Sequence, residues 1–152
     1  MLDQTLNHAW IEKHIPHQGN MCLLDEVQSW NQENIICIAS SHRELNNPLR
    51  AHNQLGIACG IEYAAQAMAV HGALLAPADS TTPKVGYLVS VRGLTMLANR
   101  LDNIAADLLI SATCVMASES NMLYEFSISA NNQQLLHGRA AVILDASALQ
   151  LS

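Results

Sequence analysis

The sequence predicts an α+β protein in which a long antiparallel β-sheet wraps around one buried α-helix. Residues 53–76 are apolar nearly all round and are not enriched in β-branched residues, a pattern typical of a buried helix. The segments after this helix alternate in the manner of strands. Because no second long helix separates the strands, parallel crossovers are excluded and an antiparallel sheet remains.

The same patterns place each element along the chain. A short helix is expected over residues 6–14, before Pro16, and residues 23–29 and 34–41 are expected to form a hairpin around a polar turn. After the long helix and a loop at 77–83, four further strands are expected at residues 86–98, 107–117, 123–130 and 134–144. With no linker or repeat, all 152 residues are expected to form a single domain.

Composition narrows the possible functions. Half of the residues are hydrophobic, which argues against disorder, and only 13% are charged, against about 25% in an ordinary soluble domain. This low charge predicts a neutral polar surface, a surface partly covered by another subunit, or both. The net charge of -6 argues against a general nucleic-acid-binding protein, which needs Lys and Arg for the phosphates.

Neither a targeting segment nor a membrane span is expected. The N-terminus lacks the basic start and apolar run of a signal peptide, and the longest apolar stretch is interrupted by Glu62, Gln66 and His71. The four cysteines form no C-x-x-C pair and are expected to be small core residues in a reducing cytoplasm. A cytoplasmic protein without contact to membranes is therefore expected.

Glu62 is the most informative residue, since it lies in the middle of the apolar helix. Burial of an ionised carboxylate is costly, so the group must be paired, protonated or placed at the mouth of a cavity. Desolvation favours the neutral acid, which suits a proton donor. The alternative is a structural ion pair with an arginine such as Arg43, Arg50 or Arg92.

His17 is the second candidate. It lies between Pro16, which restricts the backbone, and Gly19, which loosens it, just before the first expected strand. Imidazole is the usual base near neutral pH. A metal pair of His14 and His17 has little support, because no third ligand stands at a suitable spacing.

Two motifs now carry a resemblance to a known family. The run Ile15-Pro16-His17-Gln18-Gly19-Asn20-Met21-Cys22-Leu23-Leu24-Asp25-Glu26-Val27 resembles the segment L-P-H-R-x-P-F-L-L-x-D-x-V of the hotdog-fold 3-hydroxyacyl-acyl carrier protein dehydratases. The run Gly60-Ile61-Glu62-Tyr63-Ala64-Ala65-Gln66 resembles the family's helix motif, in which Gln follows the catalytic carboxylate by four residues. The overall pattern is most similar to the small dehydratases of aryl polyene biosynthesis.

This resemblance implies a fold and a chemistry. It implies the hotdog fold, with His17 as the base that removes the α-proton of a 3-hydroxyacyl thioester and Glu62 as the acid that protonates the leaving hydroxyl. It implies no cofactor and no metal. It also implies a dimer, formed with a like chain or with another hotdog subunit, in which the His and the Glu come from different protomers.

The resemblance also implies contacts with the substrate, and here the sequence departs from the family. Gly56 and Ile57 replace the family's Pro-Gly at the helix start, where a glycine N–H meets the thioester carbonyl; a backbone N–H remains at Ile57. Gln66 completes the implied substrate contacts. Gln18 replaces the family's Arg, and Asn20-Met21 replaces its Pro-Phe.

The implied partner is an acyl carrier protein, which is acidic. Between Asp79 and Asp102 there is no acidic residue, whereas Lys84, Arg92 and Arg100 are present, and these three cations form a candidate docking patch. The alternative is a sheet surface with a few solvated cations.

The sequence is therefore consistent with three candidate functions. The first is dehydration of a 3-hydroxyacyl chain on acyl carrier protein. The second is thioester hydrolysis, because hotdog proteins include thioesterases that use an acidic residue on the central helix. The third is a non-catalytic subunit that completes another dehydratase, as the changes at Gln18 and at Gly56-Ile57 suggest.

Overall fold

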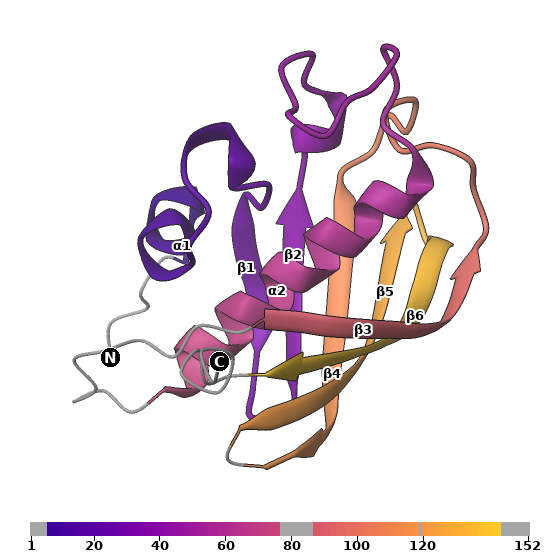
Figure 1. Cartoon of the computed structure of the whole chain (residues 1–152). Helices are drawn as coiled ribbons and strands as arrows, with labels where there is room; N and C mark the ends of the chain where they lie inside the picture. Colours follow the sequence, from indigo (N-terminus) through magenta and orange to yellow (C-terminus); the bar gives the residue numbers. More distant parts are fainter. Residues whose placement is uncertain (1–5, 77–86, 119, 144–152) are drawn as a thin grey trace, which may run out of the picture.

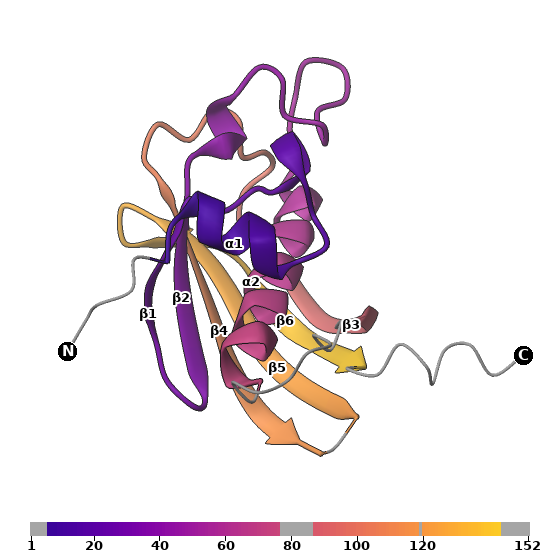
Figure 2. The same cartoon turned by 90° about the vertical axis from the view of Figure 1, so that its left-hand side faces the viewer.

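A curved antiparallel sheet encloses the helix α2 (Gly60–Leu75) in the computed structural model, which describes residues 6–76, 87–118 and 120–143 (Figure 1). The short helix α1 (His8–His14) lies beside α2 (Figure 2). The strands of the sheet are β1 (Glu26–Trp30), β2 (Asn34–Ala39), β3 (Tyr87–Met96), β4 (Leu108–Ala117), β5 (Asn121–Ala130) and β6 (Gln133–Ile143).

The order of the strands across the sheet is β1-β2-β4-β5-β6-β3, and all neighbours are antiparallel. In β5, the residues Met122, Tyr124, Phe126, Ile128 and Ala130 are buried and alternate with exposed or half-buried ones. This alternation places one face of the sheet against α2 and the other toward solvent. The predicted antiparallel sheet around a central helix is confirmed.

Helix α2 packs closely against the sheet because its first residue has no side chain. A Cβ atom at Gly60 would lie 2.7 Å from the Leu136 side chain and 2.9 Å from that of Ile128. None of the sixteen residues of α2 is fully exposed, as expected for a helix that is apolar nearly all round. The close approach fixes the first turn of the helix, and with it Glu62, over β5 and β6.

The later turns of α2 carry a buried polar group. His71 is completely buried; its Nδ1 lies 2.7 Å from the Tyr124 hydroxyl, and its Nε2 lies 2.9 Å from the carbonyl oxygen of Asn31. These two bonds use both ring nitrogens and join the helix to β5 and to the β1–β2 turn. Burial lowers the pKa of His71, so the neutral ring is favoured.

Two elements begin three or more residues after the predicted start. The long helix begins at Gly60, after a 3₁₀ turn at Ile57–Cys59, and not at residue 53. The preceding segment is extended because Leu55 and Ile57 form backbone hydrogen bonds with Leu101 and Asn99. Strand β1 begins at Glu26, since Leu23 and Leu24 are buried outside the strand. The expected loop at 77–83, residue 86 and residue 144 lie outside the described residues.

The four cysteines are free thiols, as predicted. Cys22 and Cys37 are buried, and Cys59 and Cys114 are half-buried. Burial raises the pKa of Cys37 to about 12, so the neutral thiol persists at physiological pH. In the described part of the chain, no helix is long and apolar enough to cross a membrane.

Candidate functional site

His17 lies in the segment that joins α1 to β1, and both α1 and α2 hold this segment. On the α1 side, the Gln18 side-chain amide donates to the carbonyl oxygen of Glu12 at 2.9 Å, and the Gly19 N–H donates to the Glu12 carboxylate at 2.5 Å. Gly19 has a φ of +62°, a conformation that suits glycine, and this turns the chain toward β1. These contacts define where the imidazole points.

Glu62 lies in the first turn of α2, and its side chain is 35% exposed. Its Oε1 lies 3.0 Å from Nε2 of His17, whose side chain is 26% exposed. Oε1 also accepts a hydrogen bond from the Gln66 amide at 3.2 Å, one helical turn further on. The two residues that the motifs singled out therefore form a partly solvent-accessible pair.

Gln66 is completely buried and holds the pair together. Its amide nitrogen donates to the carbonyl oxygen of Met21 at 2.8 Å, and its side-chain oxygen accepts from the Leu23 N–H at 2.9 Å. Gln66 thus fastens the His17 segment to α2 and orients Glu62. The resemblance implied a substrate contact for Gln66, and this stays a prediction; in the structure its amide nitrogen and oxygen are bonded to protein.

The resemblance also implied that the His and the Glu come from different protomers. That expectation is wrong for the observed pair, because His17 and Glu62 of one chain are in hydrogen-bond contact. The physical reason is the double attachment of the His17 segment, to Glu12 on α1 and to Gln66 on α2. Both anchors belong to the same chain as Glu62.

The ionisation of Glu62 also differs from the prediction. The hydrogen bond from His17 lowers the pKa of Glu62; desolvation opposes this effect without overcoming it, and the hydrogen bond from Gln66 reinforces it. A neutral acid kept protonated by an apolar helix was expected, and this is wrong. The carboxylate is ionised at neutral pH because two donors face it and a third of the side chain is exposed.

The arginines offered as structural partners of Glu62 lie elsewhere. Arg43 forms an ion pair with Asp107 at 2.7 Å, and Arg50 donates to the backbone carbonyls of Glu44 and Asn53. Arg92 is exposed on β3. The reading of Glu62 as the partner of one of these arginines is therefore wrong, since the group that pairs with it is His17.

The start of the helix differs from the expected carbonyl-binding site. The Ile57 N–H, expected to remain for a thioester carbonyl, donates to the carbonyl oxygen of Asn99 at 3.0 Å, and the Ile57 side chain is buried. Gly56 is exposed, and a Cβ atom there would meet nothing within 4 Å. Of the two positions, only Gly56 leaves room for a ligand at this end of α2.

The predicted docking patch is not a set of three free cations. Arg100 forms an ion pair with Asp102, whose pKa the Arg100 guanidinium holds well below its usual range, and the same carboxylate accepts the Leu55 N–H. Lys84 lies outside the described residues. Arg92 lies opposite Arg139 on the neighbouring strand β6, and Arg139 forms an ion pair with Glu125 of β5 at 3.6 Å.

Further polar residues support the site and were not predicted. Ser41 lies in a 3₁₀ turn after β2. Its hydroxyl donates to the carbonyl oxygen of Leu23 at 2.8 Å and lies 2.7 Å from the hydroxyl of buried Tyr63.

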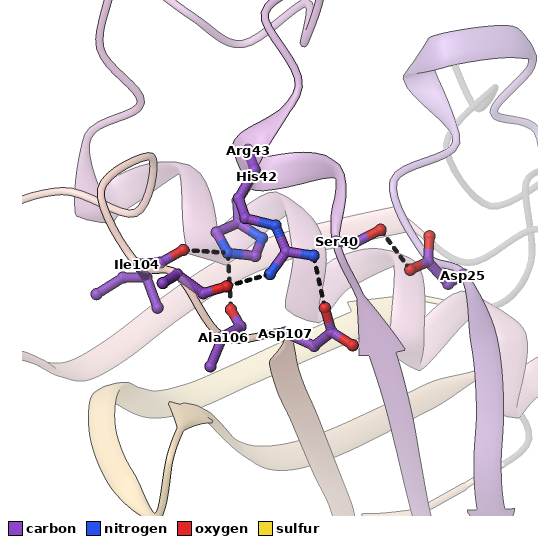
Figure 3. Close-up of polar contacts among 8 residues, drawn as sticks. Asp25, Ser40, His42, Arg43, Ile104, Ala106 and Asp107 are labelled. Carbon is purple, nitrogen blue, oxygen red and sulfur yellow. Dashed lines mark hydrogen bonds and ion pairs between the residues drawn. The ribbon is translucent and has the colours of Figure 1, made fainter.

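Next to Ser41, the buried ring of His42 and the Arg43 side chain contact backbone carbonyls of the loop before β4 (Figure 3). Figure 3 also shows the hydrogen bond from Ser40 to Asp25. The contacts of Ser41 and Ser40 hold the chain at Leu23 and at Asp25.

Little in the sequence indicated these supporting contacts. The spacing of four residues between Glu62 and Gln66 could indicate their contact, because such residues share a helix face. Glu12 and Ser41 contact the His17 segment through the tertiary fold, and no local pattern marks them. Among the described residues, no group of three or more His, Cys, Asp or Glu side chains could hold a metal ion.

A curved antiparallel sheet around one long helix defines the hotdog fold. A family model described as ApeP-like, ApeP dehydratase, matches residues 9–151. The chain therefore belongs to the ApeP-like dehydratase family. A search of curated protein sequences found no match.

Solved structures show the same fold. The dehydratase heterocomplex ApeI:P from Xenorhabdus doucetiae matches with a TM-score of 0.81 and 20% identity, over 93% of this chain and 95% of that chain. Zebra fish thioesterase superfamily member 2 matches with a TM-score of 0.62 and 16% identity, over 93% and 99%. A Staphylococcus aureus thioesterase matches with a TM-score of 0.60 and 12% identity, over 79% and 92%.

Proposed function

We propose that this protein dehydrates a 3-hydroxyacyl thioester carried by an acyl carrier protein to the 2-enoyl thioester, with His17 and Glu62 as its acid–base centre. The observation that carries the proposal is the 3.0 Å contact between His17 and Glu62 in a chain of the ApeP-like dehydratase family. Removal of water requires a proton to leave C2 and a proton to reach the 3-hydroxyl. A partly exposed imidazole–carboxylate pair suits both transfers.

The pair lies where a substrate can approach it. Both side chains are partly exposed, whereas Gln66, which donates a hydrogen bond to Glu62, is buried. Exposed Gly56, shortly before the same helix, is the proposed contact for the thioester, since a Cβ atom there would meet nothing within 4 Å. Such a division between a rigid support and an accessible pair favours a catalytic over a structural role.

The test is product formation by the purified protein. Incubation with a 3-hydroxyacyl carrier should give the 2-enoyl thioester, and both Glu62→Gln and His17→Ala should lower kcat by about a hundredfold or more. The matched control is Glu26→Gln, which changes an exposed carboxylate on β1 and should leave turnover unchanged. Full turnover in both site variants would refute the proposal.

Thioester hydrolysis is the second candidate, because several structures of the same fold are thioesterases. The products separate the two reactions: hydrolysis releases a free acid and a thiol, whereas dehydration keeps the acyl chain on its carrier. We favour dehydration because of the family match and because the Pro16-His17 motif supplies a loop histidine in contact with the helix carboxylate.

We further propose that a second hotdog subunit pairs along the edge strand β3. This strand ends the sheet, and it exposes the large apolar side chains Leu88, Val89 and Met96. An exposed apolar edge is a place where another strand adds. The ApeI:P structure is a heterocomplex, which supports a partner of this class.

The pairing can be tested by sedimentation. Val89→Lys should shift the protein toward monomer, or abolish its complex with a second dehydratase subunit, whereas Leu45→Lys, at a side chain that is 87% exposed away from any strand, should not. If the isolated protein is inactive but raises the activity of such a partner, its role is that of a non-catalytic subunit. Full activity of the isolated protein contradicts that reading.

The carrier is proposed to dock near Arg92, which is exposed on β3. Arg92→Glu should raise KM for the carrier-bound substrate by about tenfold without changing kcat. Charges at the rim of an interface act mainly on the rate at which the two proteins associate. The same variant should leave turnover of a small pantetheine thioester unchanged. An equal effect on both substrates would contradict docking at this position.

A further inference from the structure

The hydroxyl of Tyr63 lies at the centre of a buried group of hydrogen bonds. Tyr63 follows Glu62 on α2, and its side chain is completely buried. Its hydroxyl oxygen lies 2.7 Å from the Ser41 hydroxyl, and the side-chain amide of Asn47, which is also buried, donates to it at 3.1 Å. Glu62 is thus partly exposed, and the residue beside it on the helix is bonded inside the protein.

The directions of these bonds follow from what each group can donate. Ser41 has a single hydroxyl hydrogen, and this goes to the carbonyl oxygen of Leu23 at 2.8 Å, because a carbonyl only accepts. The Tyr63 hydroxyl must then donate to the Ser41 oxygen, and its own oxygen accepts from Asn47. The bonds form a chain in one direction, from Asn47 through Tyr63 and Ser41 to Leu23. Bonds in such a chain polarise and strengthen one another.

This chain holds the His17 segment at Leu23. The Leu23 carbonyl is the end of the chain, and the Leu23 N–H donates to the buried side chain of Gln66 on α2. Tyr63 and Gln66 are three residues apart, so they are neighbours on the helix surface. Both backbone polar groups of Leu23 are thus tied to α2 within about one turn of Glu62.

A second connection runs through the loop that follows Ser41. The second hydrogen of the Asn47 amide goes to the carbonyl oxygen of Ser41 at 2.9 Å, which fixes this loop against the turn. The residue before Asn47, Asn46, accepts a hydrogen bond from the Asn20 side-chain amide at 3.0 Å through its carbonyl oxygen. Asn20 lies three residues after His17. The network therefore contacts the His17 segment at two places.

We infer that the Tyr63 hydroxyl is a positioning group that sets where His17 lies relative to Glu62. The inference rests on the proposed function and adds a residue to its site. Tyr63 is completely buried, so it acts on the reaction only through the segment that it holds. The 3.0 Å contact between His17 and Glu62 depends on the placement of that segment. A displacement of a catalytic group by about 1 Å can cost about a hundredfold in rate.

The experiment compares two buried tyrosines. Tyr63→Phe removes one hydroxyl, and we expect kcat of the dehydration to fall by about tenfold with KM unchanged. The matched control is Tyr124→Phe, since Tyr124 is also buried and its hydroxyl is bonded to His71, further along α2. This control should lose a similar amount of stability in urea and keep the wild-type kcat. An equal loss of kcat in both variants would reveal a general effect of stability and overturn the inference.

Ser41→Ala tests the chain at its next bond, the one toward Leu23. This variant should lower kcat as much as Tyr63→Phe does. The double variant should lose about tenfold and not about a hundredfold, because groups of one hydrogen-bond network do not act additively. Losses that multiply in the double variant would contradict a chain that acts through Tyr63.

A further readout does not depend on turnover. The hydrogen bond from His17 is the main cause of the lowered pKa of Glu62, so a displaced His17 lets this pKa rise toward its ordinary value. Carbon NMR of the Glu62 carboxyl should show the rise in Tyr63→Phe and in Ser41→Ala, and no rise in Tyr124→Phe. A Glu62 pKa that stays at the wild-type value in Tyr63→Phe would overturn the inference. If the wild-type protein forms no enoyl product, the proposed function fails, whereas the NMR result still decides whether Tyr63 places His17.

Discussion

The two ends of helix α2 each carry a polar side chain on an otherwise apolar helix, but under opposite conditions. At the amino-terminal end, Glu62 is a third exposed and has an oxygen to which no described residue donates. Toward the other end, His71 is completely buried and bonded through both nitrogens. The comparison teaches that a polar residue in an apolar helix indicates function when it is accessible and incompletely bonded, and structure when it is neither.

Gln66 lies between these two cases, and its removal should have the largest effect on stability. Gln66→Leu leaves the Met21 carbonyl and the Leu23 N–H without their partner, each at a cost of about 1–3 kcal/mol. The His17 segment should loosen, and kcat should fall by about tenfold to a hundredfold. Urea unfolding and turnover measure the two effects.

The control for Gln66→Leu is Gln28→Leu, at an exposed position of β1. This variant should change neither stability nor turnover. If Gln66→Leu were equally silent, the view that the buried amide positions the pair would be wrong.

His71→Leu should affect stability and spare catalysis. The substitution removes the partners of the Tyr124 hydroxyl and the Asn31 carbonyl, and we expect the free energy of unfolding to fall by about 2–3 kcal/mol. The kcat of the folded fraction should stay near the wild-type value, because His71 is buried away from the accessible pair. A loss of turnover without a loss of stability would contradict the structural role that we assign to His71.

The smallest expected effect is a dependence of stability on pH. Burial lowers the pKa of His71 and of His42 below the ordinary histidine value of about 6.5. The two histidines therefore bind protons in the unfolded chain at a pH at which they stay neutral in the folded chain. The free energy of unfolding should fall as the pH drops through about 6.5. Glu62, whose pKa is also lowered, adds a further loss only in stronger acid.

Urea unfolding at about pH 7.5 and about pH 5.5 measures this dependence. The difference between the two values should shrink in His71→Gln, which cannot titrate. An unchanged difference would show that His71 is not held neutral by burial.

The sequence predicted the fold well because periodicity reports burial directly. The alternation in residues 107–117 and 123–130 and the unbroken apolar stretch around Glu62 were sufficient for a sheet around a helix. The start of the helix was placed too early, because residues 55–57 are apolar for a tertiary reason, their pairing with residues 99–101.

The candidate site was predicted in its members and not in its arrangement. His17 and Glu62 stood out by motif and environment, yet their contact within one chain depends on Glu12 and Gln66, which hold the His17 segment from two helices. The ionisation of Glu62 depends first on the hydrogen bond from His17. That contact is set by three-dimensional geometry, which spacing along the chain does not contain.

The most direct test of the central claim is a crystal structure of the Glu62→Gln protein with a 3-hydroxyacyl pantetheine thioester bound. The account predicts that C2 and the 3-hydroxyl lie about 3–3.5 Å from the side chains of residue 62 and His17. A thioester bound away from both side chains would contradict it.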